Sequence, residues 1–96
     1  MPPVNYQLSQ PVVVTEQFRS LLDRAVRDGR YRVVAGAARY MLDELAYAPN
    51  EFGEERYTLP ALGLNLRIAF VPPLVVEFAV HEESRQMFIR RVQLCR

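Results

Sequence analysis

The sequence predicts one α+β domain, made of a short N-terminal strand, an antiparallel two-helix hairpin and a three- to four-stranded antiparallel meander. Three observations carry this prediction. The chain has 96 residues, which suits a single domain over 1–96. Apolar residues recur with a helical period up to about Tyr47, and with a period of two after Gly53. Short turns separate the later segments, so consecutive strands should pair with one another.

The first helix is expected between a strand at residues 5–8 and a stop at Asp28-Gly29. Ser9 stands where an N-cap precedes a helix whose early turn tolerates Pro11. One helical face then carries apolar side chains at i, i+4, i+7, i+8 and i+11, namely Val14, Phe18, Leu21, Leu22 and Ala25.

The second helix is expected from near Tyr31 to about Tyr47, where Ala48-Pro49-Asn50 ends it. Its apolar stripe consists of Val34, Ala38, Met41, Leu42 and Leu45. Only a few residues separate the two helices, so they should form an antiparallel hairpin.

Three later segments alternate apolar and polar residues, around 64–70, 75–81 and 87–94, and 56–59 predicts one more short strand. The sheet should bury one face against the helices. The other face should carry some mixture of charged side chains, drawn from Arg67, Glu77, His81, Arg90 and Arg91. The register decides whether Arg90 or Arg91 points outward, and the sequence leaves it open.

The charge balance argues against a large electrostatic footprint for nucleic acid, because the net charge is +1 and the pI is near 7.9. All twelve basic residues are arginine, so no lysine can serve as a general base or Schiff-base nucleophile. The single cysteine, Cys95, has no partner for a disulfide, and one histidine with scattered acids makes no metal-ligand spacing. We expect no metal and no cofactor.

The N-terminal residues 1–5 lack a basic segment followed by an apolar core, so we expect no signal peptide. The longest apolar stretch, around 68–76, is broken by Pro72-Pro73 and is too short to span a bilayer. These features predict a cytoplasmic protein without a membrane partner.

Three stretches carry a resemblance to a known family: "YQLS" followed by a helix, then "APNEFGEERY", then "LRIAFVPPLVVEFAVHEESRQMFIRRVQL". They resemble, in that order, the first strand and helix, the link that leaves the second helix, and the final meander of the RelE/ParE family of bacterial toxins. The resemblance covers nearly the whole chain and implies the family's fold.

The resemblance also implies a role in a type II toxin–antitoxin system. RelE-type members cut mRNA on the ribosome with basic side chains on the sheet, whereas ParE-type members poison DNA gyrase. Both kinds are neutralised by an antitoxin segment that wraps the toxin. A cognate antitoxin is therefore the expected partner, with ribosome and mRNA or DNA gyrase as the target.

This chain departs from the nuclease pattern in three places. The middle strand begins Leu74-Val75-Val76 where an arginine is usual, Arg67 is the only basic residue of the preceding strand, and few residues follow the last strand. The resemblance therefore implies at best a partial ribosome-dependent endoribonuclease site. Its candidate catalytic residues are Arg67 and Arg91, as charge stabilisers, and His81, for proton transfer.

The candidates for binding RNA or a partner protein are Arg56, Tyr57, Arg90 and Arg96. Arginine forks suit phosphate and carboxylate equally, so a shared patch could hold RNA or an acidic antitoxin tail. Tyr57 offers a stacking surface for a base, and Glu54 could act as a base.

Blander interpretations stay open: the arginines pair with nearby glutamates, and His81 lies on the surface at a strand end. The alternative function is a non-catalytic protein-interaction module on the same fold, such as a decayed toxin.

Overall fold

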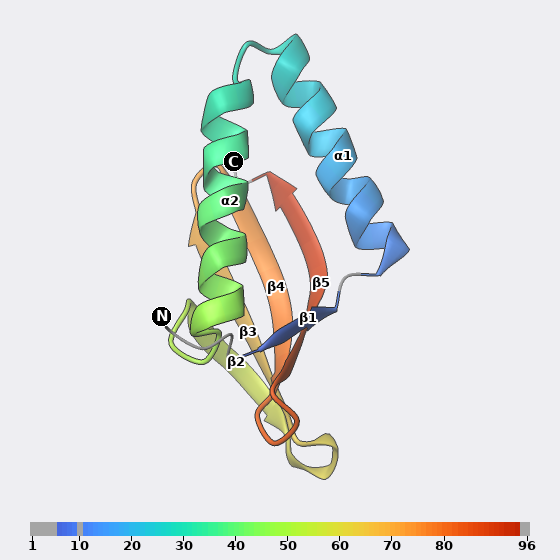
Figure 1. The fold of residues 1–96 in the computed structure, drawn as a ribbon, viewed down its shortest axis with the longest axis vertical. Helices are drawn as coiled ribbons and strands as arrows, with labels where there is room; N and C mark the ends of the chain where they lie inside the picture. Colours follow the sequence, from blue (N-terminus) through green and yellow to red (C-terminus); the bar gives the residue numbers. More distant parts are fainter. Residues whose placement is uncertain (1–5, 10, 95–96) are drawn as a thin grey trace.

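The computed structural model describes residues 6–9 and 11–94, which form two helices and a five-stranded sheet (Figure 1). The elements follow the order β1 (Gln7–Ser9), α1 (Val12–Arg27), α2 (Tyr31–Tyr47), β2 (Glu54–Leu59), β3 (Leu64–Val71), β4 (Leu74–His81) and β5 (Gln86–Leu94). A short 3-10 turn, Pro60–Leu62, joins β2 to β3. The strand order in the sheet is β1-β5-β4-β3-β2.

Strands β2 to β5 form the predicted antiparallel meander, with β2 as its fourth strand. β2 begins at Glu54, two residues before the predicted start. The first strand lies at the far edge and pairs in parallel with β5, so that Gln7–Ser9 stand opposite Gln86–Phe88. It is displaced from the predicted 5–8, of which Asn5 lies outside the described residues. The meander is therefore extended into a mixed sheet.

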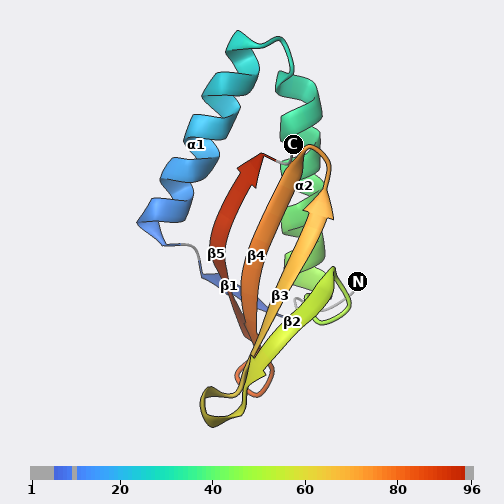
Figure 2. The same ribbon diagram turned by 180° about the vertical axis from the view of Figure 1, so that it is seen from behind.

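Both helices end where the sequence predicts. Gly29 ends α1 because its φ of +71° leaves the helical region, and the chain turns away from α2 at Ala48. The helices meet at the short connection around Gly29 and spread apart toward the sheet (Figure 1). α2 lies across one face of the sheet, α1 runs beside β5, and the other face carries no helix (Figure 2). Neither described helix combines the length and apolar character needed to cross a membrane.

The predicted N-cap at Ser9 is wrong. Ser9 is the last residue of β1, where it pairs with Phe88, and α1 starts at Val12 with Pro11 as the N-cap. The carbonyl of Pro11 accepts hydrogen bonds from the N–H groups of Val14 and Thr15, at 2.9 and 3.1 Å. The backbone of Ser9 belongs to the sheet ladder, so Ser9 cannot also open the helix.

The core lies between the sheet and the two helices. From the helices it takes the predicted stripes, with Val14, Ala25, Val34, Met41 and Leu45 nearly inaccessible to solvent. From the sheet it takes alternate residues of β4 and, with a shift at Arg90 in β5, the residues that face the helices there: Leu74, Val76, Phe78, Val80, Met87, Ile89 and Val92. Burying such side chains contributes about 1.5–3 kcal/mol each and is the main stabilisation of a domain this small.

The strand β3 faces the other way from what its apolar residues suggest. Arg67 pairs with the core residue Phe78, and Ala69 pairs with Val76, so the helix-covered face of β3 carries Arg67 and Ala69. The apolar set Leu64, Leu66, Ile68 and Phe70 lies on the open face instead. The expected placement of Arg67 on the open face is therefore wrong, because the register with β4 decides the matter.

Candidate functional site

Arg67, a candidate catalytic residue, is tied to the backbone of the loop that follows α2. Its Nε donates to the carbonyl of Phe52 at 3.1 Å and its Nη2 donates to the carbonyl of Gly53 at 3.0 Å. Phe52 in turn packs on the core, with its ring stacked 6.1 Å from that of Phe78. The guanidinium thus supplies donors to two loop carbonyls that precede β2.

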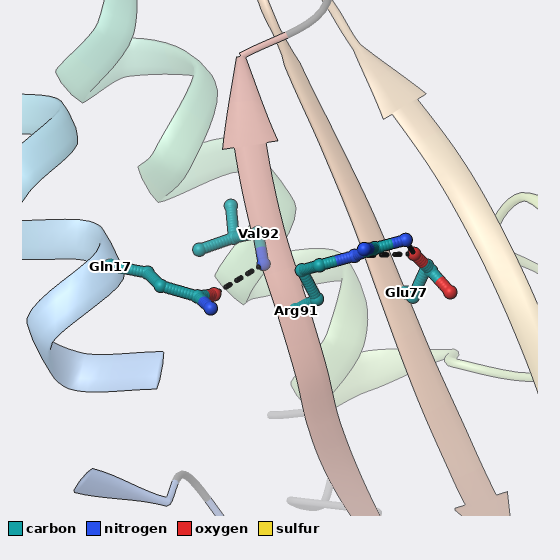
Figure 3. Close-up of polar contacts among 4 residues, drawn as sticks. All are labelled: Gln17, Glu77, Arg91 and Val92. Carbon is teal, nitrogen blue, oxygen red and sulfur yellow. Dashed lines mark hydrogen bonds and ion pairs between the residues drawn. The ribbon is translucent and has the colours of Figure 1, made fainter. Parts of the chain in front are cut away.

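Arg91, the second candidate charge stabiliser, lies on the open face and forms an ion pair with Glu77 on β4. Its Nε is 2.8 Å from Oε2 of Glu77, and its Nη2 contacts the same oxygen. Figure 3 shows Arg91 extending across β4 toward this carboxylate. Arg67 and Arg91 therefore lie on opposite faces of the sheet and cannot act on one phosphate together.

His81, the candidate for proton transfer, ends β4 and binds within its own turn. Its Nδ1 accepts from the N–H of Ser84 at 3.2 Å and lies 2.5 Å from the Ser84 hydroxyl. A neutral ring with Nδ1 as acceptor fits this arrangement. In the described residues its recorded hydrogen bonds are to Ser84 alone, so the structure brings no acid or base to it.

The binding candidates are dispersed over the strands. Arg56 lies in a bulge of β2 and Arg90 lies in a bulge of β5, so neither has a partner residue in the neighbouring strand's register. Both residues are exposed. Tyr57 is 53% exposed and stands opposite Leu66 on the open face. Arg96 lies outside the described residues. Of the two arginines left open by register, Arg91 shares the face of Glu77, and Arg90 occupies the bulge.

The open face of the sheet carries apolar side chains beside the Arg91–Glu77 ion pair. Leu66 is only 7% exposed there, because its neighbours Tyr57 on β2 and Ala79 on β4 flank it. Phe70 is 60% exposed near the end of β3. A surface of this kind suits contact with a protein better than contact with phosphates.

A cleft with a volume of about 550 Å³ separates α1 from the outer edge of β5. It is lined by residues of α1 and by two residues of β5: Val13, Glu16, Gln17, Ser20, Leu21, Asp23, Arg24, Arg27, Val92 and Gln93. The backbone N–H of Val92 points into it and donates to Oε1 of Gln17 at 2.9 Å (Figure 3). A side chain thus occupies a position that a neighbouring strand's carbonyl would otherwise fill.

This contact was not predicted, and the sequence carries only a faint signal for it. Gln17 follows the buried Val14 by three positions, at the border of the helix's apolar stripe. A polar side chain at such a border reaches a strand edge only if that edge lies beside the helix, which is a tertiary property.

A second polar cluster joins β1, the loop after α2 and the β4–β5 turn. The hydroxyl of Tyr6 donates to the carboxylate of Glu82, at 2.8 and 2.7 Å from its two oxygens, and accepts from Nδ2 of Asn50 at 3.1 Å. Burial raises the pKa of Tyr6, and its hydrogen bond to the Glu82 carboxylate and that group's negative charge raise it further. The Arg85 guanidinium, 5.8 Å from the ring centroid, acts in the opposite direction. The cluster ties three chain segments together.

The architecture is that of an α+β fold in which a helical hairpin is followed by an antiparallel meander. The fold of this chain is similar to that of a chain in the solved structure described as the chromosomal ParDE TA system from P. aeruginosa. The two chains superpose with a TM-score of 0.66 and share 14% sequence identity. The match covers 98% of this chain and 100% of that chain. No protein-family model matches the chain, and no curated protein matches its sequence.

This likeness confirms the predicted RelE/ParE-like fold. At 14% identity it speaks for the fold alone. Within residues 6–9 and 11–94, no group of three or more His, Cys, Asp or Glu side chains could hold a metal ion.

Proposed function

We propose that this chain is the toxin-like component of a type II toxin–antitoxin pair and acts in the cytoplasm together with a cognate antitoxin. The observation that carries the proposal is the match of the fold over 98% of the chain to a chain of a ParDE TA system. A fold can serve several activities, so the proposal depends in addition on a surface that suits such a partner.

The antitoxin surface that we propose is the outer edge of β5 in the α1–β5 cleft. In the described residues, β1 pairs with β5 only as far as Phe88. Because the N–H of Val92 points away from β4, the alternation of an antiparallel ladder also turns the backbone groups of Leu94 outward. An extended antitoxin segment could add to this edge through main-chain hydrogen bonds, with its carbonyl replacing Oε1 of Gln17.

The first experiment is expression of the chain with and without the product of each neighbouring gene. We expect the chain alone to slow growth, and one neighbouring product to restore growth and to co-purify with it. Unaffected growth together with no co-purifying neighbour would contradict the proposed function.

The position of the antitoxin is tested by a pair of matched variants on α1. Val13 lines the cleft and Val26 does not, and the two are 59% and 60% exposed. Val13→Lys should weaken antitoxin binding by at least tenfold, whereas Val26→Lys should leave it unchanged. If the two variants bound the antitoxin with equal affinity, the antitoxin would not bind in this cleft.

For the target, we propose that the chain acts by binding, as ParE-type members do on DNA gyrase. The separation of Arg67 from Arg91 across the sheet supports this choice, since a ribosome-dependent nuclease would need both charges beside one phosphate. Intact transcripts and gyrase-dependent DNA damage after induction are expected. Cleavage of mRNA within codons, lost in Arg91→Ala or His81→Ala, would favour the nuclease instead.

The separation of Arg67 from Arg91 across the sheet also supports the second candidate, a non-catalytic interaction module. The two candidates differ in growth: the module would bind a neighbouring gene product without slowing growth when expressed alone.

A further inference from the structure

Helix α2 carries a second apolar stripe, on a flank that the sheet leaves exposed. Val33, Gly36 and Tyr40 recur at i, i+3 and i+7, which places them on one helical face. Val33 and Tyr40 lie about 100° round the helix from the buried Val34 and Met41, and Gly36 lies further round, so this face flanks the buried stripe. Val33 is 55% exposed and Tyr40 is 54% exposed. Figure 1 shows that no other described element lies over the side of α2 that is turned away from the sheet.

Gly36 has no internal reason to be glycine. It lies in the middle of α2 with helical backbone, and a Cβ built on it would meet nothing within 4 Å. Glycine weakens a helix interior relative to alanine, so an exposed glycine is unfavourable for the isolated chain. A missing side chain at this position does allow another helix to approach α2 closely.

The charges of α2 oppose its own dipole. Arg30 is the N-cap and Arg32 lies in the first turn, whereas Asp43 and Glu44 lie toward the C-terminal end. Cations at a helix N-terminus and anions near its C-terminus are both unfavourable. Within the described residues, neither Arg32 nor Asp43 has a recorded ion-pair partner. A second α2 that runs antiparallel would bring its acidic end to this basic end.

We propose that two copies of this chain associate through antiparallel α2 helices about a two-fold axis at the level of residues 37–38. Along the helix, Gly36 lies before this level and Tyr40 lies after it at a similar distance. Arg32 and Asp43 are likewise spaced equally before and after it. Tyr40 of each copy then packs over Gly36 of the other copy, and Arg32 of each copy pairs with Asp43 of the other. Every contact occurs twice, as a two-fold interface requires.

A second copy fits this face better than an unrelated helix because Arg32 and Asp43 then pair twice, once at each end of the contact. The Tyr40 ring is also held in place before association, since it meets the Phe52 ring edge-on with centroids 6.4 Å apart and an interplanar angle of 71°. Ordering this side chain on binding therefore sacrifices little freedom. A single pair of helices buries less than a standard interface, so the dimer is weak and depends on concentration.

Sedimentation velocity on the isolated chain tests the proposal, from about 1 μM to about 1 mM, a range that spans weak association. The wild-type protein should shift from monomer to dimer across the series. Arg32→Asp and Asp43→Arg should each remain monomeric, because each variant places like charges in contact. An equimolar mixture of the two variants should dimerise again, because each supplies the charge that the other needs.

Two controls separate association from folding. Arg19→Asp makes the same charge change on an exposed position of α1 and should leave the dimer intact. Gly36→Leu should abolish the dimer while far-UV circular dichroism shows an unchanged fold, since nothing inside the chain occupies that space.

A wild-type protein that stays monomeric throughout, or a mixture that stays monomeric, would overturn the proposal; so would a dimer that persists in Gly36→Leu. The measurement uses the chain alone, so its outcome does not depend on the proposed toxin role.

Discussion

Replacing Arg67 with alanine separates a structural role of this side chain from a catalytic one. The substitution removes the bonds from Nε to the Phe52 carbonyl at 3.1 Å and from Nη2 to the Gly53 carbonyl at 3.0 Å. A hydrogen bond with a charged partner contributes about 1.5–3 kcal/mol, and less where it is exposed, as the second bond is. Allowing for that exposure, we expect a loss of about 2 kcal/mol in the free energy of unfolding.

In a domain of this size, that loss corresponds to a fall of about 10 °C in Tm, which thermal unfolding followed by circular dichroism would measure. Arg56→Ala is the matched control, because Arg56 is exposed at a β2 irregularity, and it should change stability by less than about 0.5 kcal/mol. If Arg67→Ala left Tm unchanged, these bonds would contribute nothing to stability and the reasoning would fail. If Tm were unchanged and growth inhibition were lost, Arg67 would belong to a functional site.

Three further predictions concern positions that the fold makes sensitive. Gly53→Ala should destabilise the chain by about 3 kcal/mol in denaturant unfolding, because φ is +71° and the new Cβ would clash with the carbonyl oxygen of Ile68. A loss below about 1 kcal/mol would contradict that geometry. The pKa of Tyr6 is raised in the folded chain, so the unfolded chain loses the phenolic proton at a lower pH than the folded chain does. The stabilisation that Tyr6 provides is therefore complete below about pH 10 and decreases as the pH rises further. Tyr6→Phe should remove this part of the loss of stability at alkaline pH, and a pH profile of stability identical to that of the wild type would contradict the prediction. Gln17→Ala should reduce stability by about 1 kcal/mol and speed exchange of the Val92 amide hydrogen, whereas unchanged exchange would show that the bond is not formed in solution.

The elements of this protein are determined by local sequence. The stripes of both helices follow from a period of 3.6, and the ends of those helices follow from Gly29 and the Pro49 region, which act within a turn of the chain. The meander follows from alternation and short turns, as does the position of each strand to within a few residues. The RelE/ParE-like fold could be predicted on this basis because it is an order of such elements.

The candidate site could be predicted only as a set of residues, not as an arrangement. Alternation states that neighbouring side chains of β3 point in opposite directions, but it does not state which set faces the helices. Because Leu64, Leu66 and Ile68 are apolar, the sequence suggests that they face the helices, which is wrong. They lie on the open face, where side chains of the neighbouring strands partly bury them. Arg67 is tolerated on the helix side because loop carbonyls at Phe52 and Gly53 satisfy its charge.

The sequence by itself determined the helices, the strands and the absence of lysine from any chemistry this chain performs. Tertiary structure alone decided that Arg67 and Arg91 lie on opposite faces, that Gln17 reaches the edge of β5, and that α2 keeps Val33 and Tyr40 exposed. The physical reason is that periodicity is fixed by neighbours along the chain, whereas a face or an edge is defined only by the segment packed against it.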